Sequence, residues 1–577
     1  MIQHFDPNFS NLDDVEIDSI DKDSIISELD VIKNRIVSAN NKEEAVFAIK
    51  DYFKISDDLQ TIIALVYIRH SKNTIDEKYV KLNDYLDENL PFISRADNQV
   101  SKAIFSSPFK EELKQEFGSL FFDQIQLSMK TFSDEIVDDL VEENKYVSQY
   151  INLLGSAIIS FNGENYSIGQ MGKFTSSIDR ETRKKANYAV FNFYAQNDEK
   201  IGEIYSNMIK VRTRIATKLG YENFIQLAYD RLGRLDWTEK DAAEYRNKIL
   251  KYIVPLSDEF FKKQKERLGY KEDTKYYDYV IFYKSGNPTP KGTSDDLVNA
   301  AKAMYEAMSP VTNKYFNFMV DHNCMDLVAR PNKSNGGYEE YISGLKTSFI
   351  FSNFNGTSLD VDTLTHEFGH ALQGFLAGEE IDIPSYRNSS LECCEMHSMS
   401  MEYLTYPYMD LFFKEDTEKY KYMHLADAIT FIPYGCIVDA FQTYCYTHPY
   451  LNHSQRKEYF RKLEKKYLHH RTYEDNEFLN SGGYFERQSH IFENPFYYLD
   501  YTIAQVVALE FFTESLQDKD KTFEKYINFC KLGGKYPFRA LLKEANIKNP
   551  MDGNTLEEVS SSIMNYLSTF DVDNLDK

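Results

Sequence analysis

The sequence has 577 residues and a formal net charge of −24 at pH 7. A chain of this length is too long for one compact core, so we expect at least two domains or subdomains. The acidic charge argues against nucleic acid or an anionic membrane as a partner, because both need a basic face. Six cysteines make no CxxC pair, and the N-terminus has neither a basic start nor an apolar core. These features predict a protein of the reducing cytoplasm.

Helix signals outnumber strand signals throughout the chain, which predicts the mainly α class. We expect an N-terminal helical lobe over residues 1–195 and a second domain over residues 196–577. The stretch AIISFNGENYSIGQM, residues 157–171, differs from its helical surroundings because two short β-type runs flank Asn162 and Gly163. An Asn-Gly pair between such runs is a strong hairpin signal.

A further strand is predicted at residues 343–355, read as SGLKTSFIFSNFN, where Phe349 and Phe351 alternate with smaller residues. We interpret it as an edge strand, whose unpaired backbone groups can bind an extended peptide as an additional strand. An equally good interpretation is a β-element that only supports the helix after it.

That helix, predicted over residues 358–378, contains the pattern His-Glu-x-x-His at His366, Glu367 and His370. Residues four apart lie on one face of a helix, so the two imidazoles can bind one metal ion. Glu367 then points to the flank where a bound water would lie. The alternative is a core helix whose two histidines have hydrogen-bond partners.

A catalytic zinc ion usually has three protein ligands. The metzincin pattern is excluded, because Gln373 and Leu376 stand where it requires Gly and His. The next candidates lie in residues 389–403, SSLECCEMHSMSMEY, which we expect to form a second helix. Spacing alone does not choose among its candidate ligands, which are Glu392, Glu395, His397 and Glu402.

The last informative segment, residues 480–505, begins with a Gly482-Gly483 pair that would allow a mobile loop. A histidine and three tyrosines follow it and offer hydrogen-bond donors of the kind that stabilise an oxyanion; they are His490, Tyr497, Tyr498 and Tyr501. A single His or Tyr is more often a core residue than a catalytic one.

THEFGHALQ, followed by ECCEMHSMSMEYLTYPYM, resembles the oligoendopeptidase F branch of the thimet oligopeptidase family of zinc peptidases. In that family the third ligand is a Glu with Ser three residues later and Glu seven residues later. Glu395, Ser398 and Glu402 match this pattern, so the resemblance implies Glu395 as the third ligand. Glu402 is then either a partner of a ligand histidine or a solvated carboxylate.

The resemblance also implies the architecture and the reaction. We expect two largely helical lobes, a deep channel for short unfolded peptides, and a small β-sheet beside it. Residues 196–577 would be the catalytic domain, with one Zn²⁺ ion and Glu367 as general base. The family's substrate-binding edge corresponds to the strand of Phe349 and Phe351.

In the same family, a His followed by a Tyr-x-x-Tyr pair donates hydrogen bonds to the oxyanion. His490 with Tyr498 and Tyr501 matches that pattern, and Tyr497 is a near alternative to Tyr498. Two other functions remain open, which are hydrolysis of a non-peptide amide and a catalytically silent binding protein of the same fold. The sequence leaves the oligomeric state open.

Overall fold

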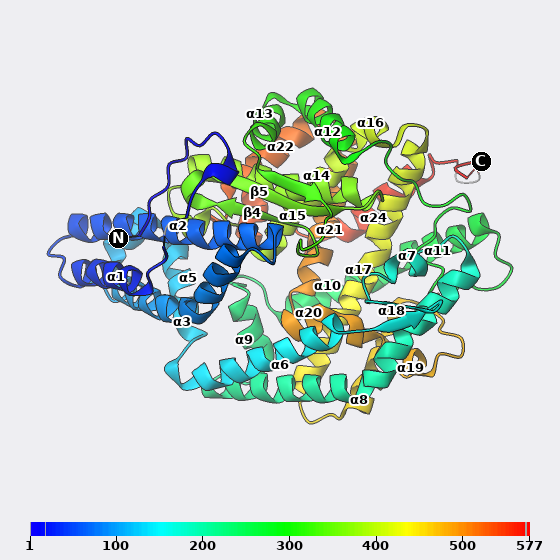
Figure 1. The fold of residues 1–577 in the computed structure, drawn as a ribbon, viewed down its shortest axis with the longest axis horizontal. Coiled ribbons are helices and arrows are strands. Elements are labelled where there is room, and N and C mark those ends of the chain that lie inside the picture. The colour runs from blue at the N-terminus through cyan, green and yellow to red at the C-terminus, as the bar shows by residue number, and fades with distance from the viewer. Residues whose placement is uncertain (1, 18, 572–573, 577) are drawn as a thin grey trace. The chain divides into compact units, whose positions relative to one another are not determined.

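The computed structural model describes residues 2–17, 19–571 and 574–576, and its helices far outnumber its strands, which confirms the predicted class (Figure 1). The chain forms two compact units. The first consists of Met1–Lys130, Thr289–Glu415 and Glu514–Ile547, and the second of Thr131–Pro288, Asp416–Thr513 and Lys548–Lys577. The boundary expected near residue 195 lies inside helix α8 (Arg180–Lys218). In the part of the chain that is described, no helix is both long and apolar enough to cross a membrane.

The first unit combines helices from three stretches of the chain with a small sheet. Its N-terminal helices are α1 (Lys22–Val37), α2 (Lys42–Lys72), α3 (Glu77–Phe105), α4 (Lys110–Phe117) and α5 (Ser119–Lys130). Its later helices are α12 (Ser294–Met308), α13 (Pro310–Asp321), α14 (Leu359–Glu380), α15 (Leu391–Leu404), α16 (Asp410–Phe413), α22 (Lys519–Leu532) and α23 (Phe538–Glu544). Helix α14 contacts the sheet and helices α15 and α22, and its middle part is almost completely buried (Figure 1).

The sheet of the first unit has the strand order β3-β5-β4. Strand β5 (Thr347–Phe354) pairs in parallel with β3 (Met325–Val328) and antiparallel with β4 (Tyr338–Ile342). The prediction of a strand here is confirmed, but its assignment as an edge strand is wrong. Because β5 has a partner on each side, the edges of this sheet are β3 and β4.

The burial of β5 explains the error. Phe349 and Phe351 are both fully buried, and the ring of Phe351 stacks on Tyr338 of β4 with 4.9 Å between ring centroids. Ser348 and Ser352 flank these residues on the chain, and both are buried as well. A strand that is buried on both faces is typical of a central position, so the alternation of large and small residues was not a sign of solvent exposure.

The second unit is built on the long helices α8 and α17 (Thr417–Thr447). Its other helices are α6 (Val137–Gly155), α7 (Gly172–Thr175), α9 (Phe224–Arg231), α10 (Glu239–Tyr252), α11 (Val254–Leu268), α18 (His453–Tyr467), α19 (Glu477–Asn480), α20 (Ser489–Glu493), most of α21 (Tyr498–Ser515) and α24 (Thr555–Leu567). The predicted hairpin is confirmed as β1 (Ile159–Phe161) paired antiparallel with β2 (Glu164–Tyr166). Asn162 and Gly163 between them both have positive φ, as a tight hairpin turn requires.

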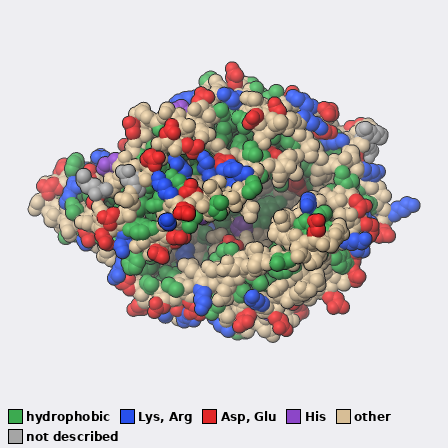
Figure 2. Space-filling view, in the orientation of Figure 1, with side chains coloured by type: hydrophobic (Ala, Val, Ile, Leu, Met, Phe, Trp, Pro, Cys, Tyr) green, Lys and Arg blue, Asp and Glu red, His purple; other side chains and the backbone are tan. Residues whose placement is uncertain are grey.

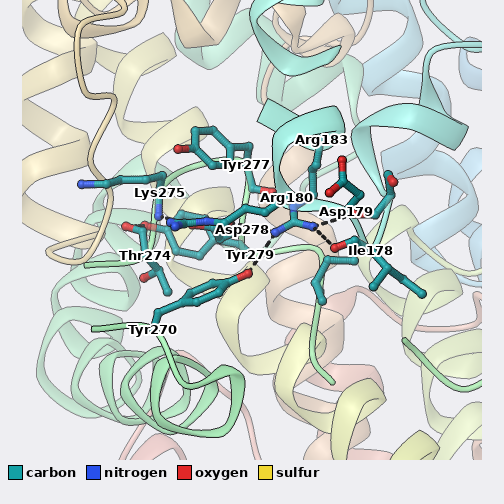
Figure 3. Close-up of polar contacts among 12 residues, drawn as sticks. Ile178, Asp179, Arg180, Arg183, Tyr270, Thr274, Lys275, Tyr277, Asp278 and Tyr279 are labelled. Carbon is teal, nitrogen blue, oxygen red and sulfur yellow. Dashed lines mark hydrogen bonds and ion pairs between the residues drawn. The ribbon is translucent and has the colours of Figure 1, made fainter. Parts of the chain in front are cut away.

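A buried ion cluster fixes the beginning of α8 to the segment after α11 (Figure 3). Asp278 accepts hydrogen bonds from Arg180 at 3.0 and 2.8 Å and from Arg183 Nη2 at 2.9 Å. Arg183 also donates to the carbonyl of Tyr277 at 2.7 Å. Both Arg183 and Asp278 are fully buried, and each charge is thus balanced inside the unit.

At the surface, Figure 2 shows acidic side chains interspersed with basic ones over the face that it draws.

Candidate metal centre

The helix of the His-Glu-x-x-His pattern forms as α14, within two residues of the predicted bounds. Asp360 secures its first turn by accepting the backbone N–H groups of Asn355 and Gly356, at 2.9 and 2.7 Å. One turn of the helix separates His366 from His370, and their ring centroids lie 5.1 Å apart. The pattern therefore places two imidazoles side by side, as the helical period requires.

Close packing of α15 against α14 brings a carboxylate to these rings. At Gly369 an added Cβ would lie 2.6 Å from the Cα of Ser398, so only glycine permits this approach. Glu395 Oε2 then lies 3.4 Å from His366 Nε2 and 3.8 Å from His370 Nε2. Each of these residues offers one ligand atom within 4.8 Å of the other two.

The other candidates of α15 lie outside this group of ligand atoms. Glu402 Oε1 lies 2.7 Å from His366 Nδ1, so an Nδ1–H of His366 donates to that carboxylate. This hydrogen bond fixes the ring and leaves the Nε2 lone pair for a cation. Glu392 is buried, and His397 is buried with its ring stacked on Phe529 at 4.1 Å.

The acid groups around the histidines shift one another's pKa. Burial, together with the neighbouring charges of Glu395 and Glu402, raises the pKa of Glu367 to about 7, although the charge of His366 lowers it. Burial lowers the pKa of His370 to about 4, so its ring is neutral and able to bind a metal. For His366, burial lowers the pKa but contacts with Glu395 and Glu402 outweigh it, and the pKa rises well above its usual value.

One residue of this site was missed by the sequence analysis. The backbone N–H of Glu339 on β4 donates a hydrogen bond to the carboxylate of Glu367, and burial raises the pKa of the Glu339 carboxyl to about 8. Nothing in the stretch NGGYEEY distinguishes Glu339 from its neighbour Glu340. Only the pairing of β4 with β5 brings it to α14.

The donor set fits a zinc ion. Zinc bonds of about 2.0–2.2 Å in tetrahedral geometry separate two ligand atoms by about 3.3–3.6 Å. The measured separations of 3.4 and 3.8 Å from Glu395 to the two imidazoles are close to this range. Two imidazole nitrogens with one carboxylate also match the ligand type of catalytic zinc sites, which keep a fourth position for water. A bound cation would displace the Nε2 proton that Glu395 and Glu402 favour on His366.

The predicted oxyanion donors belong to the second unit, where they contact one another. The ring of His490 lies 4.8 Å from that of Tyr498 and 5.8 Å from that of Tyr501, between centroids. Tyr497 lies 5.0 Å from Tyr501 on the same basis. Burial raises the pKa of Tyr498, which keeps its phenol protonated at neutral pH.

The proton on His490 has a structural cause. The amide nitrogen of Gln488 lies 2.9 Å from His490 Nδ1 and donates to it, which places the ring proton on Nε2. Tyr434 donates to the amide oxygen of Gln488 at 3.0 Å and so fixes the amide's orientation. Upstream, Gly482 has a φ of +97°, and an added Cβ would lie 1.9 Å from the carbonyl oxygen of Lys457. Glycine is therefore required there, while hinge motion at this pair remains a prediction.

The helical fold and this convergence of two imidazoles with a carboxylate define a protein with a hydrolase-type candidate metal centre. Comparison with known families agrees. The profile of peptidase family M3 matches residues 173–561, and that of the peptidase M3 N-terminal domain matches residues 12–132. The chain belongs to peptidase family M3, and within it to the oligoendopeptidase F branch.

Individual relatives match over nearly the whole chain. An oligoendopeptidase F homolog of Borreliella burgdorferi is 21% identical over 87% of this chain and 88% of its own length. Oligopeptidase PepF of Bacillus subtilis is 22% identical over 85% of this chain and 75% of its own. Among solved structures, PZ peptidase A with an inhibitor has a TM-score of 0.91 at 40% identity, covering 98% of this chain and all of the other. Oligoendopeptidase F of Enterococcus faecium, with 16% identity, a TM-score of 0.59 and coverage of 96% and 99%, shares the fold.

Proposed function

We propose that this protein is a zinc-dependent oligoendopeptidase that hydrolyses internal bonds of short unfolded peptides. One observation carries the proposal, which is the meeting of His366, His370 and Glu395 around one point beside Glu367. Membership of peptidase family M3 supports peptide bonds as the target, in preference to other amides. The intact set of His366, Glu367, His370 and Glu395 weighs against a silent binding protein, because such a protein would not need the acid at position 367.

His366, His370 and Glu395 would hold one zinc ion. When bound, zinc lowers the pKa of water and polarises the scissile carbonyl. Glu367 takes the proton of the attacking water and later transfers it to the leaving amine. A pKa near 7 suits both steps, because such a group accepts and releases a proton readily at neutral pH.

His490 and Tyr498 would donate hydrogen bonds to the oxyanion of the tetrahedral intermediate. Gln488 supports this role, because its amide keeps the proton of His490 on Nε2. The raised pKa of Tyr498 supports it as well, since an ionised phenol cannot donate. Tyr501 would hold substrate, and Tyr497 remains the alternative donor. Gly482 and Gly483 would allow the loop to close on substrate.

We place the peptide backbone along β4 in place of the central strand β5. Gln60 of α2 donates to the carbonyl of Tyr341 at 2.6 Å and therefore occupies the outer edge of β4 at that residue. Pairing with substrate is thus confined to the part of β4 before Tyr341, which includes Glu339 and lies beside Glu367. A cytoplasmic location is part of the proposal, supported by six cysteines that are all unpaired.

The test uses a pool of short synthetic peptides together with a folded protein and a non-peptide amide. Products are identified by mass spectrometry before and after treatment with a zinc chelator, and again after zinc is restored. We expect internal fragments of the peptides only, lost with the chelator and recovered with zinc. Release of single terminal residues would contradict an endopeptidase, and cleavage that persists in the chelator would contradict the metal.

A further inference from the structure

A second group of metal-binding side chains lies in the second unit, apart from the His-Glu-x-x-His helix in sequence. It consists of Asp198 on α8, His453 at the start of α18 and Glu486 in the short 3₁₀ helix η7 (Gly483–Arg487). His453 Nε2 lies 2.6 Å from Asp198 Oδ1 and 3.3 Å from Glu486 Oε1. Each residue offers one ligand atom within 4.8 Å of the others.

Glu486 is the unusual member of this group. Its side chain is 0% exposed, and among the described residues its ionised carboxylate has no hydrogen-bond donor other than His453 Nε2, which lies 3.3 Å from Oε1. Burial of a carboxylate without such partners is costly, so native proteins normally pair it or bind a cation to it. The site therefore attracts positive charge.

The charges in the group do not balance. Lys457 Nζ lies 2.6 Å from Asp198 Oδ2 and compensates one carboxylate. Among the described residues, no lysine or arginine forms an ion pair with the second carboxylate, that of Glu486, whose Oε1 lies 3.3 Å from His453 Nε2. The cluster in Figure 3 is different, because there two guanidinium groups surround the single carboxylate of Asp278.

The backbone holds the imidazole in place. Gly202 lies one turn after Asp198 on α8, and a Cβ added there would lie 2.4 Å from His453 Cγ. The ring of His453 therefore packs directly on the helix backbone, with its Nε2 toward Asp198. The other side of the group is also fixed, since the hydroxyl of Tyr150 donates to the backbone carbonyl of Glu486 at 2.9 Å.

We propose that Asp198, His453 and Glu486 bind a second divalent transition-metal ion, of the Zn²⁺ or Mn²⁺ class. One imidazole nitrogen and two carboxylate oxygens suit these ions, whereas Mg²⁺ and Ca²⁺ prefer oxygen ligands alone. On binding, the metal replaces the hydrogen bond between His453 and Asp198 and places a positive charge beside the carboxylate of Glu486. It joins η7 to α8 and α18 and so anchors the segment that leads to His490.

Metal content is the direct test. Wild-type protein and the Glu486→Gln variant are loaded with Zn²⁺, desalted and analysed by plasma mass spectrometry. We expect the variant to hold one equivalent less than wild type. Glu464→Gln is the matched control, since Glu464 is a buried carboxylate of α18 already paired with Arg461 and Tyr473. Equal zinc content in wild type and Glu486→Gln would overturn the proposal. It would mean that a proton on Glu486, and not a metal ion, neutralises this carboxylate.

A second variant covers the case that Glu486→Gln does not fold. Asp198 is 29% exposed, so Asp198→Asn leaves no buried cavity. In a His366→Ala/His370→Ala background, the cluster would be the remaining site, and Co²⁺ added there should give visible ligand-field bands that Asp198→Asn removes. Absence of bands in the double variant, with circular dichroism showing an intact fold, would overturn the proposal. This result is independent of peptide hydrolysis, so it is distinguishable from failure of the proposed function.

Discussion

The ion cluster at Asp278 and the candidate metal centre both bury carboxylates beside nitrogen groups. In the first, the positive groups outnumber the carboxylate, and in the second, the carboxylates outnumber the histidines. Two arginines serve Asp278, and they and the backbone N–H of Lys275 lower its pKa although burial alone would raise it. At the metal centre the acids outnumber their partners, and burial with neighbouring carboxylates raises the pKa of Glu367 to about 7. A saturated cluster stabilises the fold, whereas an excess of acid leaves a place for a cation and a proton.

The largest expected effect is on turnover, and it concerns Glu367, the proposed proton acceptor of the candidate metal centre. Glu367→Gln keeps the size of the side chain but removes its basicity, so turnover should fall about a hundred- to ten-thousand-fold. Zinc content should stay unchanged, because position 367 is outside the ligand set. The checks are kcat on a fluorogenic peptide and metal analysis. Glu379→Gln, on the same helix but paired with Lys314 at 2.9 Å, is the control. A Glu367→Gln enzyme with wild-type kcat would remove Glu367 from the mechanism.

A substitution in the ion cluster at Asp278 should instead lower the stability of the fold. Asp278→Asn leaves the buried guanidinium of Arg183 without its counter-charge, which should cost about 3–5 kcal/mol in the free energy of unfolding. Denaturant titration measures this loss, and zinc content should not change. Asp179→Asn is the control, since Asp179 is the N-cap of α8 and asparagine caps about equally well. A loss no larger than in Asp179→Asn would show that the cluster is not a stabilising one.

Sequence reasoning succeeded where a local period determines geometry. His366 and His370 had to share a face because they are four residues apart on one helix. Glu395 could not be chosen that way, because its approach depends on the contact of Gly369 with Ser398 between two helices. The family resemblance supplied that residue, and the interatomic distances agree with it.

The failures share a physical cause. Alternation in TSFIFSNF predicted a strand correctly, yet a strand's number of neighbours depends on pairing with distant segments. The group of Asp198, His453 and Glu486 is spread over three elements of the second unit, so no spacing pattern reveals it. Even the orientation of His490 depends on Gln488 and thus on an amide that Tyr434 fixes from another helix.

A smaller effect should follow at the partner of a ligand histidine. Glu402→Gln keeps a hydrogen bond to His366 Nδ1 but removes the charge that makes the ring a better ligand. Such partners typically contribute about 10–100-fold to metal affinity. Competition with a zinc chelator measures the change, and Glu379→Gln again serves as the control. Unchanged zinc affinity would mean that the charge of Glu402 beside His366 does not contribute to metal binding.

The pH dependence of stability separates two buried carboxyls by sign, that of Glu340 on β4 and that of Asp278. Burial raises the pKa of Glu340 to about 7 although Gln60 lowers it, so the folded state binds this proton more tightly than the unfolded chain. Its contribution is complete below about pH 4.5 and is lost as pH rises through about 7, at no more than about 1.4 kcal/mol per pH unit. For Asp278 the pKa is lowered, so its contribution is present above about pH 4 and is lost as pH falls.

Denaturation midpoints measured from acid to neutral pH should therefore change in opposite ways in two variants. Glu340→Gln should flatten the decline between about pH 4.5 and 7, while Asp278→Asn should flatten the decline on the acid side. Each variant is the control for the other, because both replace a carboxyl by an amide. If Glu340→Gln left the decline of the midpoint between about pH 4.5 and 7 unchanged, the carboxyl of Glu340 would be charged in the folded state.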